Sequence, residues 1–386
     1  MKTRTWAEIN LDALKNNIRE VRRITSRDAL VMATVKADAY GHGAVECANV
    51  FLENGADRLA VACYSEALQL RNAGISAPIL ILGASFEDEI EGIIENNITI
   101  AVFDYLFAKN ISTIAKKKNK IAKIHIKLDT GMSRLGFVAG VNDEEIIDEI
   151  IRISELENIE IEGIFSHFST SDEKNTDYTE LQFERFMKIC NELEKRDLKI
   201  PVRHIANSAG IIMYPKMHLD MVRAGIILYG LYPSNDIDKS RIDLKRAMSV
   251  KSQITHIKEI CDNRGVSYGN EYITNGKTKI ATIPVGYADG YTRMLGGKAK
   301  ILVNDEPRDV IGRICMDQCM IDVTNVNNIN VGDEVTIFGP KTVTADTLAS
   351  WLGTINYEIV CMVSKRIPRI FYRNGRMVSV LNYLDR

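Results

Sequence analysis

The chain has 386 residues, of which 46% are hydrophobic and 26% charged, and its formal net charge at pH 7 is −2. This length predicts two domains that each bury a core, and the near-neutral charge gives no reason to expect nucleic acid or an anionic membrane as a partner. The opening MKTRTWAEIN lacks the apolar core of a signal peptide, and no stretch approaches the roughly 20 apolar residues of a membrane span.

The seven cysteines are scattered, odd in number and contain no C-x-x-C pair. This pattern argues against a disulfide framework and against a structural zinc site. Cys315 and Cys319 lie four residues apart without a histidine cluster, so we expect no metal there. The cysteine pattern fits a reduced, cytoplasmic setting.

The first two-thirds of the chain alternate between short apolar runs and amphipathic segments. Runs of this length and composition are typical of buried parallel strands. Eight of them alternating with helices predict an α/β fold of the (β/α)8 TIM barrel type. No dinucleotide-binding G-x-G-x-x-G follows the first run, which disfavours a doubly wound sheet. The runs are 31–35, 59–62, 79–82, 99–102, 123–128, 161–166, 203–206 and 219–222.

Three of the intervening segments are expected to be helices, at about 43–54, 143–153 and 178–196. In the first two, apolar residues recur on one helical face. The third begins near Asp177, and Glu180 three residues later has the spacing of a capping box.

After about residue 243 the pattern changes to alternating strands separated by turns such as NGKT and GPKT. The sequence therefore predicts a barrel over residues 11–243 and a C-terminal, mainly β domain over 244–386. The expected strand segments are 251–260, 277–286, 298–305, 308–315 and 333–339.

Polar residues follow several of the predicted barrel strands. Because the carboxyl ends of barrel strands meet at one mouth, these side chains should converge there. A strand-end lysine can equally be a solvated surface residue, and histidines or arginines can satisfy loop carbonyls, so fold alone names no reaction. The residues are Lys36, Lys127 with Asp129 and Arg134, His167, Asn207, Ser208, and Arg223 with Gly225 and Ile226.

Nine collinear segments resemble motifs of the alanine racemase family, and TWAEINLDAL (5–14) near the start also fits. The resemblance spans essentially the whole chain. It implies a barrel followed by a β domain, with the family's first strand, here residues 1–10, belonging to the β domain. The segments are VKADAYGHG (35–43), KLDTGMSRLGF (127–137), GIFSHFSTSDE (163–173), HIANSAG (204–210), MVRAGIILYGLYP (221–233), VSYGNEY (266–272), IPVGYADGY (283–291), RICMDQCMIDV (313–323) and GTINYEIVC (353–361).

The resemblance implies two-base racemisation of L- and D-alanine with pyridoxal 5'-phosphate as cofactor, supplying D-alanine for peptidoglycan. Racemisation needs an acid/base group on each face of the substrate Cα, and the cofactor supplies the electron sink. Lys36 corresponds to the lysine that bonds to the cofactor and, once freed, serves one face. Tyr268 of the partner subunit corresponds to the base on the other face. The active site would therefore be shared within a head-to-tail homodimer.

Two residues correspond to helpers of Tyr268. A phenol titrates near pH 10, so a hydrogen-bonded and cationic surround of His167 and Arg223 would favour its ionised form. Arg223 also matches the residue that contacts the pyridine nitrogen. A guanidinium holds its proton, so the ring nitrogen should stay unprotonated and side reactions should be suppressed. The alternatives are a half-buried strand tyrosine for Tyr268 and a barrel-rim salt bridge for Arg223.

The resemblance also implies the remaining contacts. Arg134 corresponds to a residue that bonds the cofactor's phenolic oxygen and approaches the substrate carboxylate. Lys127 corresponds to a lysine that is often carbamylated and then orients that arginine, the alternative being a surface pair with Asp129. Other cofactor contacts, mainly to phosphate, would come from Tyr40, Asn207, Ser208, Gly225, Ile226 and Tyr357, and substrate contacts from the Met316 backbone and from Tyr287 and Tyr357 at the entrance.

Three other activities fit these residues less well. A racemase that prefers serine is disfavoured by Tyr357, where the best-known serine enzymes differ. A decarboxylase of basic amino acids shares the two-domain architecture but carries different lysine and C-terminal motifs. A barrel-only carrier of the cofactor would lack the second domain with VSYG and RICMD, which this chain contains.

Overall fold

The computed structural model describes residues 4–385 and divides into two compact units. The barrel unit comprises Leu14–Ala39 and Ala44–Leu244. Among the described residues, the β unit comprises residues 4–13, the short segment Tyr40–Gly43, and residues 245–385. The expected fold class, a TIM barrel with a mainly β second domain, is confirmed. None of the helices within residues 4–385 is both long and apolar enough to span a membrane.

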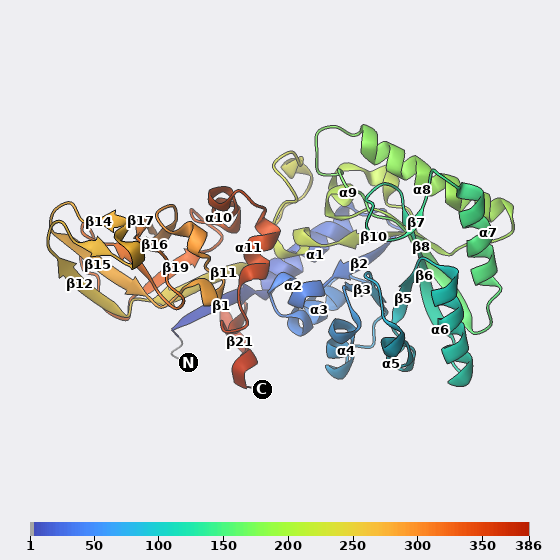
Figure 1. Ribbon diagram of the computed structural model, residues 1–386, viewed down its shortest axis with the longest axis horizontal. Helices are drawn as coiled ribbons and strands as arrows, with labels where there is room; N and C mark the ends of the chain where they lie inside the picture. The colour runs from blue at the N-terminus through green and yellow to red at the C-terminus, as the bar shows by residue number, and fades with distance from the viewer. Residues whose placement is uncertain (1–3, 386) are drawn as a thin grey trace. The chain divides into compact units, whose positions relative to one another are not determined.

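Eight parallel strands form the barrel, and each of the eight predicted apolar runs contributes one of them (Figure 1). The barrel is nearly closed: β9 and β10 are bridged by backbone bonds from Asp220 N to the Arg203 carbonyl (3.1 Å) and from Arg223 N to the Ala206 carbonyl (2.9 Å). The strands, in barrel order, are β10 (Met221–Ala224), β2 (Leu30–Thr34), β3 (Arg58–Val61), β4 (Ile79–Ile81), β5 (Thr99–Val102), β6 (Ala122–Asp129), β8 (Ile159–Phe165) and β9 (Val202–His204).

Helices cover the outside of the barrel because their apolar stripes pack against the strands (Figure 1). The three expected helices are confirmed as α3 (Ala44–Glu53), α7 (Asp143–Ser154) and α8 (Asp177–Lys195). The others are α1 (Leu11–Ile24), α4 (Tyr64–Asn72), α5 (Ile90–Glu95), α6 (Tyr105–Lys117) and α9 (Ser208–Met213), and a two-residue strand, β7 (Phe137–Val138), pairs with β6.

The capping box expected at α8 is wrong. The residue before the helix, Thr176, has φ −93° and ψ −14°, and its side chain makes no cap bond. Side-chain caps usually come from residues in the extended region, which Thr176 does not occupy. Instead, the Asn175 side-chain carbonyl accepts a hydrogen bond from Asp177 N at 2.9 Å.

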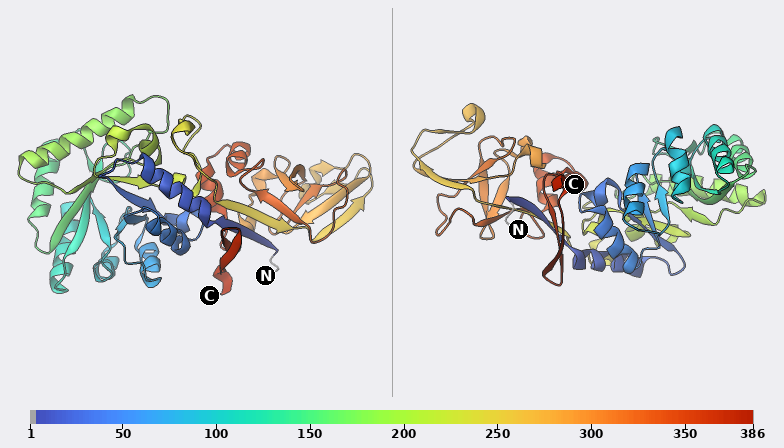
Figure 2. Two further views of the ribbon diagram at one scale, coloured as in Figure 1. Left: turned by 180° about the vertical axis from the view of Figure 1, so that it is seen from behind. Right: turned by 90° about the horizontal axis from the view of Figure 1, so that it is seen from below.

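The β unit is built on a ten-stranded sheet that begins with the first strand of the chain. Strand β1 (Thr5–Asn10) pairs antiparallel with β11 (Met248–Gln253) and parallel with β20 (Arg369–Arg373), so the first and the late strands of the chain lie in one sheet (Figure 2). Each of the five predicted segments contains a strand, and 251–260 is divided into β11 and β12 (His256–Ile260). The rest are β15 (Thr278–Ile283), β16 (Lys300–Val303), β17 (Glu306–Ile311), β18 (Cys319–Asp322), β19 (Glu334–Phe338) and β21 (Arg376–Leu381).

Smaller elements complete the β unit. A two-stranded hairpin joins β13 (Gly265–Val266) to β14 (Tyr272–Ile273). Helices α10 (Ala345–Leu352) and α11 (Asn356–Met362), which the sequence analysis did not predict, follow β19.

Candidate active site

Lys36 leaves strand β2 into a left-handed helical turn. Ala37, Asp38 and Ala39 have φ between 51° and 54° and ψ between 47° and 50°. Left-handed geometry costs roughly 1–2 kcal/mol for each residue with a Cβ, so the turn must be held by its surroundings. The Glu66 carboxylate accepts from Ala37 N at 2.7 Å, and the Asp38 carboxylate accepts from Ala44 N at 2.9 Å. These bonds fix the direction in which the half-buried Lys36 leaves the barrel.

Arg223 is buried in the barrel interior, with 4% of its surface exposed. Its Nη1 donates to His204 Nδ1 at 2.8 Å, and its Nη2 donates to His167 Nδ1 at 3.1 Å. The two nitrogens also donate to the carbonyls of residues 166, 204 and 205. Within residues 4–385, Arg223 pairs with no carboxylate, so the alternative of a rim salt bridge is wrong. Its Nε–H makes none of these bonds and remains available to a ligand.

His167 lies beside Arg223 at the barrel mouth. Because an arginine nitrogen can only donate, the Nδ1 atom of His167 must accept, which places the proton of the neutral imidazole on Nε2. Burial, with the charges of Arg223, Lys127, Arg134 and Lys36, lowers the pKa of His167 well below its usual value. Because these four charges act on His167, the five predicted residues lie near one another in the barrel. His167 therefore stays neutral and offers an Nε2–H donor.

Lys127 is buried, so the alternative of a surface pair with Asp129 is wrong. Its Nζ lies 4.6 Å from the centre of the Phe165 ring. Burial first, and then the charges of Arg223 and Arg134, lower the pKa of Lys127 well below its usual value. The Asp129 carboxylate is engaged elsewhere: its Oδ1 accepts hydrogen bonds from the backbone N–H groups of residues 131, 132 and 133, which it holds in a tight loop.

Residues 207–208 and 225–226 form a group of backbone and hydroxyl donors. The Asn207 side chain accepts from Gly210 N and from the Ser171 hydroxyl, and thereby caps α9. The Gly225 N–H donates to the Ser208 hydroxyl at 2.9 Å. The buried Ile226 N–H, one residue later, has no acceptor among the hydrogen bonds of the described residues. An unsatisfied buried N–H beside a hydroxyl suits an anionic group.

Tyr268 lies in the β unit, directly after a strained residue. Ser267 has φ 67° and ψ −171°, a region that non-glycine residues occupy at a cost of order 1–3 kcal/mol. Its hydroxyl donates to the Arg313 carbonyl at 2.6 Å, and Gly312 leaves room for the close approach, since a Cβ there would lie 2.5 Å from the Val266 carbonyl oxygen. Tyr268 is 67% exposed, so the alternative of a half-buried strand tyrosine is wrong.

The loop of Arg313 also carries Met316, which is 53% exposed. The Tyr287 N–H donates to the Cys315 carbonyl at 3.1 Å, so the β unit brings the segments of Tyr268, Tyr287 and Met316 together. In the same unit, the rings of Tyr40 and Tyr357 lie 6.1 Å apart at 51°. Ser267 could not be identified from the sequence, because backbone strain is not visible in composition.

His125 and His204 were also missed, since both were read as members of apolar strands. They are fully buried in the barrel interior. A histidine at an inward-facing position of an otherwise apolar run was the signal that could have identified them.

Four histidines with lowered pKa values predict that the protein loses stability in mild acid. Burial lowers the pKa values of His125, His167, His204 and His218 in the folded state, whereas in the unfolded chain they titrate near 6.5. Below that pH the unfolded state binds more protons, so stability falls as the pH falls. A histidine that stays neutral in the folded state contributes about 1.4 kcal/mol per pH unit, so His167 and His204, whose pKa values are lowered furthest, together contribute about 3 kcal/mol per pH unit.

Denaturant midpoints measured between pH 7 and pH 5 would check this prediction. A His256→Gln variant is the control, because His256 is exposed and its replacement should leave the slope unchanged. A stability that stays level across this range would contradict the prediction.

Comparisons with known proteins agree with this architecture. Residues 9–233 match the N-terminal domain of alanine racemase, and residues 247–371 match its C-terminal domain. The chain is 51% identical over 382 residues to alanine racemase 1 of Clostridium acetobutylicum, covering 98% of each chain. It is 52% identical over 369 residues to the alanine racemase of Methanococcus maripaludis, covering 95% of this chain and 98% of that protein.

Solved structures extend the likeness to three dimensions. The alanine racemase of Clostridium difficile matches with a TM-score of 0.97 and 45% identity over 100% of both chains. The Bacillus anthracis alanine racemase with bound L-Ala-P matches with a TM-score of 0.93 and 37% identity, over 100% of this chain and 99% of that one. With both domains and nearly the full length matched, this chain belongs to the alanine racemase family.

Proposed function

We propose that this protein is an isomerase that interconverts L-alanine and D-alanine with pyridoxal 5'-phosphate as its cofactor. The observation that carries the proposal is the set of cations at the barrel mouth. A buried Arg223 with a free Nε–H lies in the same mouth as Lys36, in a chain of this family. Family membership supports the reaction, and the donor chemistry of the mouth supports the cofactor.

The residues present fit an anionic, aromatic cofactor. When bound, pyridoxal phosphate supplies an electron sink for the electron pair released at the substrate Cα. Ser208, Gly225 and Ile226 would hold the phosphate, supported by the unsatisfied Ile226 N–H. Arg223 Nε would donate to the ring nitrogen, and Arg134 would bind the phenolic oxygen and the substrate carboxylate. By family resemblance, Tyr40, Asn207 and Tyr357 complete the cofactor contacts.

Two bases on opposite faces would move the proton. Lys36 would hold the cofactor, and its amine would exchange a proton at the substrate Cα. Tyr268 of the partner subunit serves the other face. The Nε2–H of His167 is suited to donate to a phenolate oxygen, and Arg223 adds a positive charge beside His167.

A homodimer would bring Tyr268 to the site of the other chain. The proposal is supported by exposed apolar side chains on both units, which a monomer would leave in water. On the barrel unit they follow the carboxyl ends of strands: Phe86, Leu106, Val138, Val141, Tyr178 and Leu181. On the β unit they include Ile273, Tyr287, Met294 and Met316, in addition to Tyr268 itself.

The substrate contacts and modification follow from the same family likeness. The Met316 backbone of the partner subunit would bind the substrate carboxylate, with Tyr287 and Tyr357 lining the entrance. The buried Lys127 is suited to carbamylation, because its lowered pKa leaves a neutral amine and the product would pair with Arg134.

The cellular role is part of the proposal. Residues 11–243 would act as the cofactor-binding barrel, and 244–386 with a strand from 1–10 as the domain that completes the partner's site. The seven free thiols support a reduced, cytoplasmic setting. The D-alanine produced would serve peptidoglycan synthesis.

Chiral analysis of pure L-alanine incubated with the enzyme tests the proposed function. D-alanine should accumulate to an equal mixture of the enantiomers, and activity of cofactor-depleted protein should return when pyridoxal phosphate is added. In D₂O the α-proton should exchange from either enantiomer. A kcat/KM for serine above that for alanine would contradict the substrate, and carbon dioxide release from a diamino acid would identify a decarboxylase instead.

A further inference from the structure

A chain of polar side chains crosses the barrel interior from Arg58, the first residue of β3, to Arg223 on β10. Arg58 Nη1 lies 2.7 Å from Glu162 Oε2, which lies 3.2 Å from His125 Nε2. His125 Nδ1 lies 2.8 Å from His204 Nε2, and His204 Nδ1 lies 2.8 Å from Arg223 Nη1. Four contacts thus connect an ion pair at the amino ends of the strands to the proposed cofactor site.

The direction of every hydrogen bond in this series of side chains follows from the groups at its two ends, Arg223 and the Glu162 carboxylate. Arg223 can only donate, so His204 Nδ1 accepts and its proton lies on Nε2. That proton is donated to His125 Nδ1, so the His125 proton lies on Nε2 and is donated to the Glu162 carboxylate. Burial lowers the pKa values of both histidines, so each is neutral and carries one ring proton.

Glu162 is suited to be the terminal acceptor. Burial acts to raise its pKa, but the hydrogen bonds from His125 and Arg58 and the charge of Arg58 outweigh that effect and lower the pKa to about 2. The carboxylate is therefore ionised and cannot donate. Its Oε2 atom accepts from His125 and Arg58 together, whereas Oε1 faces Lys123 at 3.8 Å.

The two imidazole rings are held in place by their neighbours. The His204 ring stacks on Phe165, with centroids 4.9 Å apart and planes 4° apart. Gly163 makes room for the His125 ring, since a Cβ there would lie 2.5 Å from its Cε1 atom. Neither ring can rotate freely, so a change in its hydrogen bonding requires the proton to change nitrogen rather than the ring to turn.

We infer that Glu162 and His125 are positioning residues for Arg223. By accepting the His125 proton, Glu162 makes His204 offer a lone pair to Arg223 and keeps the guanidinium in the orientation that leaves its Nε–H available. The catalytic consequence rests on the proposed contact of Arg223 with the cofactor. Without an acceptor at Glu162, the Arg58 guanidinium would be the polar group that faces His125 Nε2, and it can only donate. This favours moving the ring protons of His125 and His204 from Nε2 to Nδ1. The His204 Nδ1–H would then face the Arg223 donor.

Ring-nitrogen NMR of protein labelled with [15N]histidine tests the inference directly, because the chain has only six histidines. Wild-type protein, with or without cofactor, should carry the protons of His125 and His204 on Nε2, with the two signals assigned from His125→Gln and His204→Gln variants. A His204 proton on Nδ1 in the wild type would overturn the inference. This result does not depend on activity, so it separates the inference from the proposed function.

Two substitutions distinguish a role of Glu162 as hydrogen-bond acceptor from a role in packing alone. Glu162→Gln can keep one oxygen in the place of Oε2, so its proton positions should match the wild type and kcat should stay within a few-fold. Glu162→Met removes the acceptor, so a His204 population protonated on Nδ1 should appear and kcat should fall about 10- to 100-fold with little change in KM. Equal behaviour of the two variants overturns the inference, and if Glu162→Met fails to fold, the wild-type and Glu162→Gln spectra decide.

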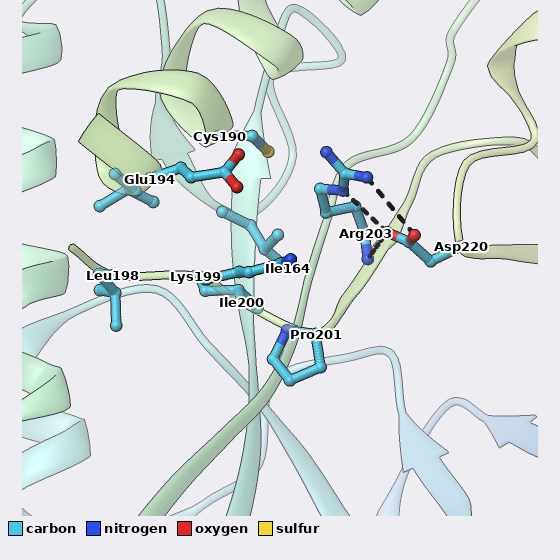
Figure 3. A pocket seen from close by; sticks show the side chains of 10 residues that line it. Ile164, Cys190, Glu194, Leu198, Lys199, Ile200, Pro201, Arg203 and Asp220 are labelled. Atoms are coloured by element: carbon cyan, nitrogen blue, oxygen red, sulfur yellow. Dashed lines mark hydrogen bonds and ion pairs between the residues drawn. The ribbon is translucent and has the colours of Figure 1, made fainter. Parts of the chain in front are cut away.

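The control is a neighbouring ion pair, Arg203–Asp220, that is not part of the hydrogen-bonded series from Arg58 to Arg223. Arg203 precedes His204 on β9, and its Nε lies 2.8 Å from Asp220 Oδ2 beside a cavity of about 500 Å³ (Figure 3). Asp220→Asn should change neither the histidine protons nor kcat. A kcat loss as large as that of Glu162→Met would mean that any ion-pair loss in this region disturbs the site, which would also overturn the inference.

Discussion

Replacing Lys36 with alanine is expected to abolish racemisation, with a loss of at least about 10⁴-fold, because one residue both anchors the cofactor and moves a proton. The left-handed turn after Lys36 is held by hydrogen bonds to Glu66 and Asp38. The variant should therefore fold, with the unfolding midpoint of the cofactor-free wild-type protein. Borohydride reduction followed by mass spectrometry should find the cofactor on the wild-type peptide that contains Lys36.

The control for this variant is Lys116→Ala, which removes a lysine whose side chain is 65% exposed and pairs with Glu157. It should retain full activity and the labelled Lys36 peptide. Activity in Lys36→Ala, or a cofactor label on another lysine, would contradict the assignment of Lys36.

Replacing Tyr268 with phenylalanine is expected to slow turnover in both directions by about 10²- to 10⁴-fold, the usual contribution of a positioned acid or base. The side chain is 67% exposed, and the loop is held by the Ser267 hydroxyl, so folding and cofactor binding should be preserved. Initial rates from L-alanine and from D-alanine, with the bound cofactor's absorbance, would measure both effects. Tyr272→Phe, four residues away, is the matched control and should be fully active.

Mixing the two inactive variants tests whether the site is shared. In a heterodimer of Lys36→Ala and Tyr268→Phe chains, one site has both residues and the other has neither. After unfolding and refolding together, an equal mixture should regain about a quarter of the wild-type activity, because half of the dimers are mixed and each has one intact site. Refolding either variant alone should restore nothing. Failure of the mixture to regain activity would contradict a site completed by the partner subunit.

The barrel could be predicted from the sequence because its strands are buried on both faces, which leaves continuous apolar runs. The same strands explain why Lys36, Arg134, His167 and Arg223 were correctly expected to lie together: the carboxyl ends of parallel barrel strands meet at one mouth. The family likeness added the chemistry, which residue patterns alone do not name.

The β unit was less predictable from local patterns. Strand β21 reads RMVSVL with three exposed apolar residues, so it lacks the alternation of a half-buried strand. Strand β18 has only four residues, and the two short helices α10 and α11 are too brief to show a clear period. Pairing with neighbours in the ten-stranded sheet, rather than local propensity, stabilises the strands.

What the sequence by itself determined is the order of the barrel strands and the residue types at their ends, since burial on both faces leaves continuous apolar runs that are visible in the sequence. Only the tertiary structure decided what those side chains do to one another. Whether Arg223 forms a rim salt bridge or is buried against two imidazoles, and whether His125 is a core residue or one part of a chain to Glu162, depends on contacts between strands far apart in sequence. Hydrogen-bond direction and desolvation are set by those contacts, so the protonation of the site follows from the fold and not from the order of the residues.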